Sequence, residues 1–110
     1  MKNGVPVSNG SDSPVELPDV MAGIQCAVTR KTLNGAKEYL PEEAFTIKEA
    51  IDSYTIQGAK ASFEETKKGM IQQGMVADFV VLDANLFEIE PEKIKDVKII
   101  ATYLNGERVA

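Results

Sequence analysis

Histidine is absent from all 110 residues of the sequence. It is the commonest metal ligand in proteins and the usual general base near neutral pH. Its absence excludes Ser-His-Asp triads, Cys-His pairs and histidine-based metal sites built from this chain alone. Catalysis by these residues would have to use carboxylates, lysines or hydroxyl groups.

Cysteine is almost absent as well, since Cys26 is the only one. Neither an intrachain disulfide nor a cysteine cluster for zinc can therefore form. This pattern fits a reducing compartment, and we expect a cytoplasmic protein. Cys26 lies close in sequence to Ile24, Ala27 and Val28, so we expect a buried, unreactive side chain.

Long apolar runs and basic patches are also missing. The longest apolar run, residues 79–82, is far shorter than the ~18 residues of a membrane helix. The N-terminal residues lack the basic and apolar pattern of a signal peptide. The chain has 17 Asp and Glu against 12 Lys and Arg, and the lysines at 67–68 and 93–98 are interleaved with acidic residues. We therefore expect neither nucleic acid nor an anionic membrane surface as a partner.

The first half of the chain predicts one short strand and a helical middle. Residues 5–8 favour a strand that ends in a turn over 9–14. A helix is predicted over 20–30, with inward residues Val20, Ile24, Ala27 and Val28. Thr46 and Glu49 have the spacing of a capping box at the start of the next helix. That helix has an apolar face of Ile47, Ala50, Ile51, Tyr54 and Gly58, and a polar face of Lys48, Glu49, Asp52 and Ser53.

A further helical stretch is predicted over 59–68. Glu64 and Lys68 form a favourable i,i+4 pair, and Gly69 supplies the stop. We expect Gly58 to mark a close approach between elements.

The last third of the chain predicts strands. They cover 70–71, 78–82 and 97–104, with a turn at 72–74 and one helical turn over 91–95. Asn105-Gly106 is a strong hairpin signal, so residues 107–109 should return antiparallel. Residues 79–82 do not alternate, which predicts a strand covered on both faces. Because the strand at 5–8 lacks an evident partner and the strand at 79–82 needs material on two sides, we expect further polypeptide to complete the fold.

Asp12 is the candidate catalytic residue. It follows directly on the predicted strand at 5–8, and in a β/α barrel the active site gathers at the carboxyl ends of the strands. An alternative is that Asp12 forms an Asx-turn or caps the following segment. Arg30 could steer an anionic substrate or form a surface ion pair, and Tyr54 and Tyr103 are expected to pack.

Four stretches, in order, carry a resemblance to a known family. Residues 10–15, Gly-Ser-Asp-Ser-Pro-Val, resemble the loop after the eighth barrel strand of the amidohydrolase superfamily. The branch is amidohydrolase family 3, which includes N-substituted formamide deformylases. Similar stretches follow at 23–30, 49–62 and 69–83. The resemblance runs from Gly4 to Val109.

This resemblance implies an α+β fragment. Residues 1–69 would form the last strand and helices of a (β/α)8 barrel, and residues 70–110 the C-terminal strands of a composite β-sandwich. Asp12 matches the family's catalytic aspartate, which contacts the metal and shuttles a proton in metal-dependent hydrolysis of C–N bonds. The whole enzyme would carry a divalent metal, with zinc expected, and act on a small amide-type substrate. Its main partner would be the N-terminal remainder of the same polypeptide.

Two departures from the family pattern affect these expectations. The family's metal site also uses histidines, and this chain has none. Met70 and Met75 replace the usual Ser and Lys, both within the sandwich segment. The isolated chain is therefore expected to bind no metal and to be inactive. The alternative is a non-catalytic binding or assembly module derived from an amidohydrolase tail, which could form a homo-oligomer through open sheet edges.

Overall fold

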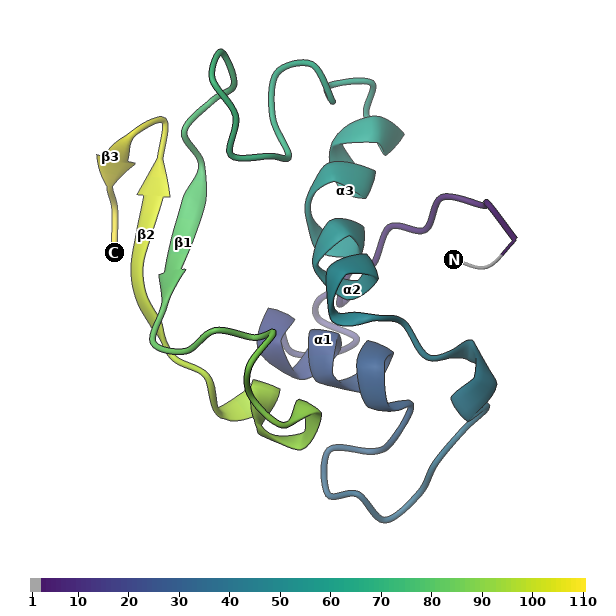
Figure 1. Cartoon of the computed structure of the whole chain (residues 1–110). Coiled ribbons are helices and arrows are strands. Elements are labelled where there is room, and N and C mark those ends of the chain that lie inside the picture. Colours follow the sequence, from purple (N-terminus) through teal and green to yellow (C-terminus); the bar gives the residue numbers. More distant parts are fainter. Residues whose placement is uncertain (1–2) are drawn as a thin grey trace.

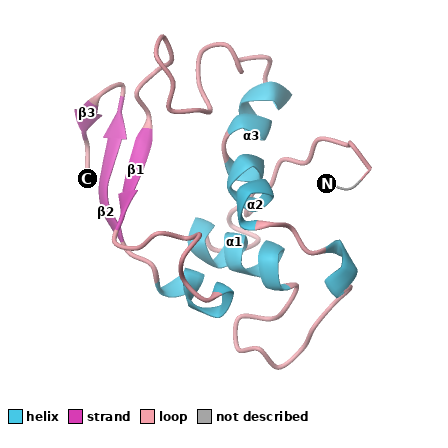
Figure 2. Cartoon of the chain, viewed as in Figure 1, coloured by secondary structure: helices cyan, strands magenta, loops and turns pink. Residues whose placement is uncertain are grey.

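The computed structural model describes residues 3–110 (Figure 1). Helical elements occupy the middle of the chain and a small sheet its end (Figure 2), which agrees with the predicted α+β composition. In chain order the elements are α1 (Val20–Thr29), the 3₁₀ helix η1 (Pro41–Glu43), α2 (Ile47–Tyr54), α3 (Ile56–Ala61), β1 (Phe79–Leu82), the 3₁₀ helix η2 (Pro91–Asp96), β2 (Ile99–Leu104) and β3 (Glu107–Arg108).

Helix α1 confirms the helix predicted over 20–30. The Asp19 side chain accepts a hydrogen bond from the Ala22 N–H at 3.0 Å and so caps its start. Its buried residues are Met21, Ile24 and Gln25, whereas Val20 is 41% exposed. The predicted inward position of Val20 is therefore wrong, because the stripe of α1 that packs on η2 and α2 lies one residue further along.

Helix α2 begins with the predicted capping box. The Thr46 side chain accepts from the Glu49 N–H, and the Glu49 carboxylate accepts from the Thr46 N–H. The helix ends at Tyr54, and α3 follows after Thr55. Ser53 was predicted on the polar face but is fully buried.

The helix predicted over 59–68 is wrong beyond Ala61. Residues 62–68 form turns, in which the N–H of Glu64 donates to the carbonyl of Ala59 at 2.8 Å. The Ser62 hydroxyl donates to the same carbonyl at 3.1 Å, which helps to end the helix. Gly69 has a φ of +100°, and a Cβ there would lie 2.9 Å from the Ile56 Cα, so both conformation and space require glycine.

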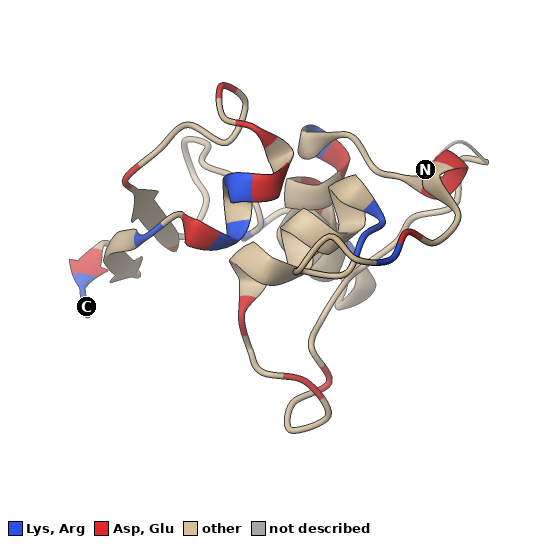
Figure 3. Cartoon of the chain, turned by 90° about the horizontal axis from the view of Figure 1, so that it is seen from below, with Lys and Arg blue, Asp and Glu red and all other residues tan. Residues whose placement is uncertain are grey.

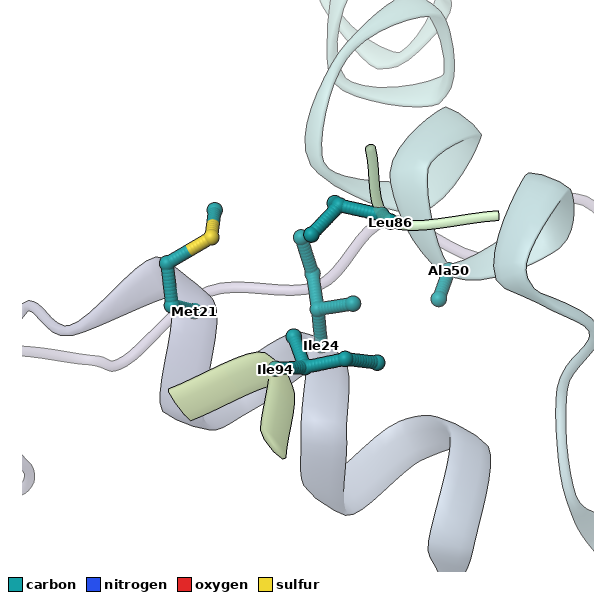
Figure 4. Close-up of a cluster of buried hydrophobic side chains, with 5 residues drawn as sticks. All are labelled: Met21, Ile24, Ala50, Leu86 and Ile94. Carbon is teal, nitrogen blue, oxygen red and sulfur yellow. The ribbon is translucent and has the colours of Figure 1, made fainter. Parts of the chain in front are cut away.

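The hydrophobic core lies where α1, α2 and η2 meet. Figure 4 shows Ile24 of α1 beside Ile94 of η2, and both are almost completely buried. The whole cluster comprises Met21, Ile24, Ala50, Leu86 and Ile94. Residues of both predicted segments, 1–69 and 70–110, contribute to it. The boundary between those segments stays a prediction.

The buried amide of Gln25 joins α1 to η2. Its side-chain oxygen accepts a hydrogen bond from the Lys95 N–H at 2.9 Å. A buried polar group without a partner would cost stability, so this bond explains how glutamine is tolerated in the core.

The sheet is antiparallel in the order β1-β2-β3. The predicted hairpin at Asn105-Gly106 is confirmed, with positive φ at both residues. Phe79 stacks on Tyr103 with ring centroids 4.6 Å apart, so Tyr103 packs as expected. The prediction that residues 79–82 are covered on both faces is wrong for the described residues, since Val80 is 46% and Val81 39% exposed.

Two predicted strands, at 5–8 and 70–71, are not strands in this structure. A strand needs a neighbour that offers a ladder of backbone hydrogen bonds. Next to the segment at 5–8, Asn9 instead binds the end of α2, where its N–H donates to the carbonyl of Ser53. A strand-like residue pattern in a short segment does not reveal whether a partner strand lies beside it.

Lys and Arg positions are interspersed with Asp and Glu positions along the ribbon (Figure 3). The predicted Glu64–Lys68 pair is present, and other ion pairs join Lys48 to Asp52 and Lys95 to Asp96. Such exposed pairs contribute little to stability, about 0–1 kcal/mol each. Within residues 3–110, no helix combines the length and apolar character needed to cross a membrane.

Candidate functional site

The loop that contains Asp12 contacts the end of α2 at Asn9 and then folds into a tight turn before α1. The N–H of Val15 donates to the carbonyl of Asp12 at 2.8 Å, and the N–H of Glu16 donates to that of Ser11 at 3.3 Å. Asp12 has a φ of +51°, a conformation that Asp and Asn adopt more readily than most residues. The turn predicted over 9–14 is confirmed in its second half only, since the turn covers residues 12–15.

Asp12 is exposed, as are the other residues of this turn. The capping role that was the alternative for Asp12 belongs to Asp19, whose carboxylate accepts from the N–H of Ala22. The side chain of Asp12 therefore remains a candidate for chemistry.

A cavity of about 690 Å³ lies directly beside the turn. Ser11, the residue before Asp12, forms part of its wall. The opposite walls come from α1, from the end of α2 and from the loop after α1. The residues that line the cavity include Gly10, Ser11, Gly23, Cys26, Leu33 and Tyr54. A smaller cavity of about 280 Å³ shares Gly23, Cys26 and Tyr54 with it.

Cys26 is half-buried in the wall between the two cavities. Burial raises the pKa of its thiol, and the negative charge of Glu16 raises it further. The thiolate is the nucleophilic form of cysteine, so this environment disfavours reaction at Cys26.

Arg30 and Tyr54 have defined places near this wall. The Nε of Arg30 donates to the carbonyl of Tyr39 at 3.0 Å, a backbone contact that was not among the predicted roles. Tyr54 packs over α1, as predicted. Burial raises the pKa of its hydroxyl, as does the neighbouring Cys26.

Gly23 gives Tyr54 its place against α1. A Cβ at position 23 would lie 2.1 Å from the Tyr54 Oη and 2.9 Å from its Cζ, which is too close for any side chain. By contrast, a Cβ at Gly58 would make only an ordinary contact of 3.6 Å with the Ser8 hydroxyl. The close approach predicted at Gly58 therefore occurs at Gly23.

Gly23→Ala is expected to destabilise the protein by about 1–3 kcal/mol, because Tyr54 must leave its position. In a Tyr54→Ala background the same change should instead stabilise, by up to about 1 kcal/mol, since alanine favours the helix. Urea unfolding of the parent, the two single variants and the double variant measures the change in the free energy of unfolding in each background. Gly58→Ala is the matched control and should be neutral or stabilising. Equal losses from Gly23→Ala in both backgrounds would contradict the role of Tyr54.

The described residues do not by themselves fit a metal site. Residues 3–110 contain no group of three or more His, Cys, Asp or Glu side chains that could surround an ion. Zinc takes about four ligands and magnesium about six. A metal in contact with Asp12 would need most of its ligands from other polypeptide.

Comparison with known proteins gives the family. The family model described as Amidohydrolase family matches residues 1–110. The chain belongs to the amidohydrolase family. The resemblance carried by residues 10–15, 23–30, 49–62 and 69–83 is thereby confirmed.

Three curated relatives resemble this amidohydrolase chain along most of its length. A Bacillus subtilis protein named as an amidohydrolase, YtcJ, is 35% identical over 99% of the chain and 21% of the relative. The N-substituted formamide deformylase of Arthrobacter pascens is 34% identical over 94% of the chain and 19% of the relative. The protein LONG AFTER FAR-RED 3 of Arabidopsis thaliana is 31% identical over 91% of the chain and 17% of the relative.

The amidohydrolase chain therefore spans about a fifth of the length of these relatives. No solved structure matches it significantly.

Sequence reasoning missed the contact between Asn9 and Ser53 that ties the Asp12 loop to α2. A signal was present, because Ser53 follows Ala50 by three residues and so lies on the same face of the helix. The polar side chain of Ser53 favoured a place on the solvent-exposed face of α2, but its hydrogen bonds to Asn9 and Ala50 allow it to be buried.

Proposed function

We propose that these 110 residues are the C-terminal part of a metal-dependent hydrolase that cleaves non-peptide C–N bonds in small amide-type molecules. In the complete barrel, where a neighbouring strand would offer hydrogen bonds to residues 5–8, residues 1–69 would supply the last strand and helices of a (β/α)8 barrel, and residues 70–110 part of a β-sandwich. The full-length polypeptide, which contains these residues together with the rest of the barrel, is called the complete enzyme below. The N-substituted formamides in the name of the Arthrobacter relative are the first substrates to test.

Asp12 is the residue we propose as the proton shuttle. It would accept a proton from the attacking water and pass it to the leaving nitrogen, a role that needs a carboxylate within hydrogen-bond reach of both. The observation that carries this proposal is the exposed turn of Asp12, within the stretch that resembles the family's catalytic loop. Asp12 itself does not line the cavity of about 690 Å³, but the preceding residue, Ser11, does. Asp12 would also contact the divalent metal, with zinc proposed, whose other ligands come from the rest of the complete enzyme.

A second groove lies on the surface of the chain, and we propose that the rest of the complete enzyme fills it. This groove, of about 590 Å³, lies between α2, α3 and β1, and its apolar lining includes Ile51, Met70, Ile71 and Val80. Within residues 3–110, β1 pairs only with β2, so its other edge is open. Further polypeptide would cover both the groove and the open edge.

The assembly module remains a second candidate function, because that open edge could also recruit a second copy. Antiparallel self-pairing of β1 about its centre, however, would place Asp78 opposite Asp83 of the other copy. Like charges opposite each other destabilise a strand pair. Sedimentation of the isolated chain separates the candidates, since a discrete dimer would support the assembly module.

The decisive experiment compares the isolated chain with the complete enzyme. The isolated chain is expected to bind no stoichiometric metal and to hydrolyse no amide, while the complete enzyme should do both. Elemental analysis and a colorimetric assay of released amine provide the two measurements. About one tightly bound ion per isolated chain, or amide turnover by it, would contradict the proposal.

A further inference from the structure

Two hydrogen bonds join the loop of Asp12 to the end of α2. The N–H of Asn9 donates to the carbonyl of Ser53 at 3.0 Å, and the Asn9 Nδ2 donates to the Ser53 Oγ at 3.0 Å. The two residues are 44 positions apart in the chain. This pair of contacts is called the Asn9–Ser53 clamp below.

Ser53 is held in a single orientation at this point. It is fully buried, and its hydroxyl donates to the carbonyl of Ala50 at 2.6 Å while it accepts from Asn9. A hydroxyl has one proton to donate, so these two bonds fix the direction in which it can accept. The buried serine therefore offers the side chain of Asn9 a rigid acceptor.

The clamp lies only three residues before Asp12. Beyond it the loop is closed by its own backbone, since Val15 donates to the carbonyl of Asp12 and Glu16 to that of Ser11. One side of the Asp12 turn is thus anchored to α2, and the turn itself is closed internally. An exposed carboxylate gains a defined position only if groups behind it hold its backbone.

We propose that Asn9 and Ser53 are positioning residues, which hold Asp12 in the orientation needed for proton transfer. This inference rests on the proposed function of Asp12. Neither residue would touch the substrate. Small displacements of a reacting group can lower a rate by about a hundredfold, so loss of the clamp should act on turnover rather than on substrate binding.

The test uses Asn9→Ala, Ser53→Ala and the double variant in the complete enzyme. Each single change is expected to lower kcat about 10–100-fold with little change in KM, and the double variant should lose no more than the worse single one. Asn9 lies on a loop, so Asn9→Ala should fold even if Ser53→Ala does not.

Ser62→Ala is the matched control. Ser62 also bonds a carbonyl three residues earlier in a helix, that of Ala59, but it is exposed and outside the Asp12 loop. It should leave both kcat and KM unchanged. Clamp variants that lower thermal stability but keep the kcat of the parent would overturn the positioning role.

Asp12→Asn separates this inference from the proposed function. If Asp12→Asn abolishes turnover while both clamp variants retain it, the clamp proposal fails and the proposed function stands. If Asp12→Asn also retains full turnover, the role of Asp12 fails and the clamp proposal fails with it.

Discussion

Asp12→Asn in the complete enzyme is expected to lower kcat by about 10²–10⁴-fold, the usual contribution of a general acid or base. Asparagine has the size of aspartate but cannot accept a proton from water and return it to a leaving nitrogen. The turn should survive, because Asn also tolerates the positive φ found at this position. Steady-state kinetics on a simple N-substituted formamide measure the loss.

Asp96→Asn provides the matched control for this prediction. Asp96 is an exposed aspartate that pairs with Lys95 at 2.7 Å, at the end of η2 and outside the Asp12 loop. The same chemical change there should leave kcat within a factor of about two, because exposed ion pairs contribute little. A loss of similar size in both variants would mean that charge in general, rather than Asp12, matters.

Metal content distinguishes the two roles proposed for Asp12. If Asp12→Asn retains its metal but loses turnover, the proton shuttle is supported. If excess metal in the assay restores full turnover, Asp12 is only a ligand. Elemental analysis of the purified variant, before and after metal addition, gives the answer.

Local chemistry explains why the start of α2 and the last hairpin turn were predictable from the sequence. Thr46 and Glu49 specify a helix start through bonds within four residues of one another, and those bonds are present. Asn105 and Gly106 specify their turn in the same local way. Predictions of this kind need no knowledge of what lies elsewhere in the chain.

Long-range packing explains what the sequence could not reveal. The pattern at 79–82 correctly predicts a strand, but the cover on its faces depends on other segments. Likewise, the partner of Ser53 is Asn9, which is 44 residues away. The candidate site was predicted only through the motif around Asp12. Its cavity walls arise from the packing of α1 against α2, and its clamp from the contact of Asn9 with Ser53 of α2.

Among the substitutions proposed here, Ile94→Ala is expected to lower the free energy of unfolding most, by about 2–5 kcal/mol. Ile94 is fully buried and packs on α1, so the shorter side chain would leave a cavity between η2 and the helix. Since domains are stable by only about 5–15 kcal/mol, this loss could unfold a large share of the isolated chain. Urea unfolding followed by circular dichroism provides the measurement.

Ile71→Ala is the matched control, and it also tests what fills the second groove. Ile71 is 87% exposed in this structure, so the change should shift the stability of the isolated chain by less than about 0.5 kcal/mol. In the complete enzyme, polypeptide that covers the groove would bury Ile71, and the same change should then cost about 2 kcal/mol or more. Ile94→Ala should be costly in both proteins, because its neighbours all lie within this chain. A negligible cost of Ile71→Ala in the complete enzyme would mean that the groove stays open to solvent.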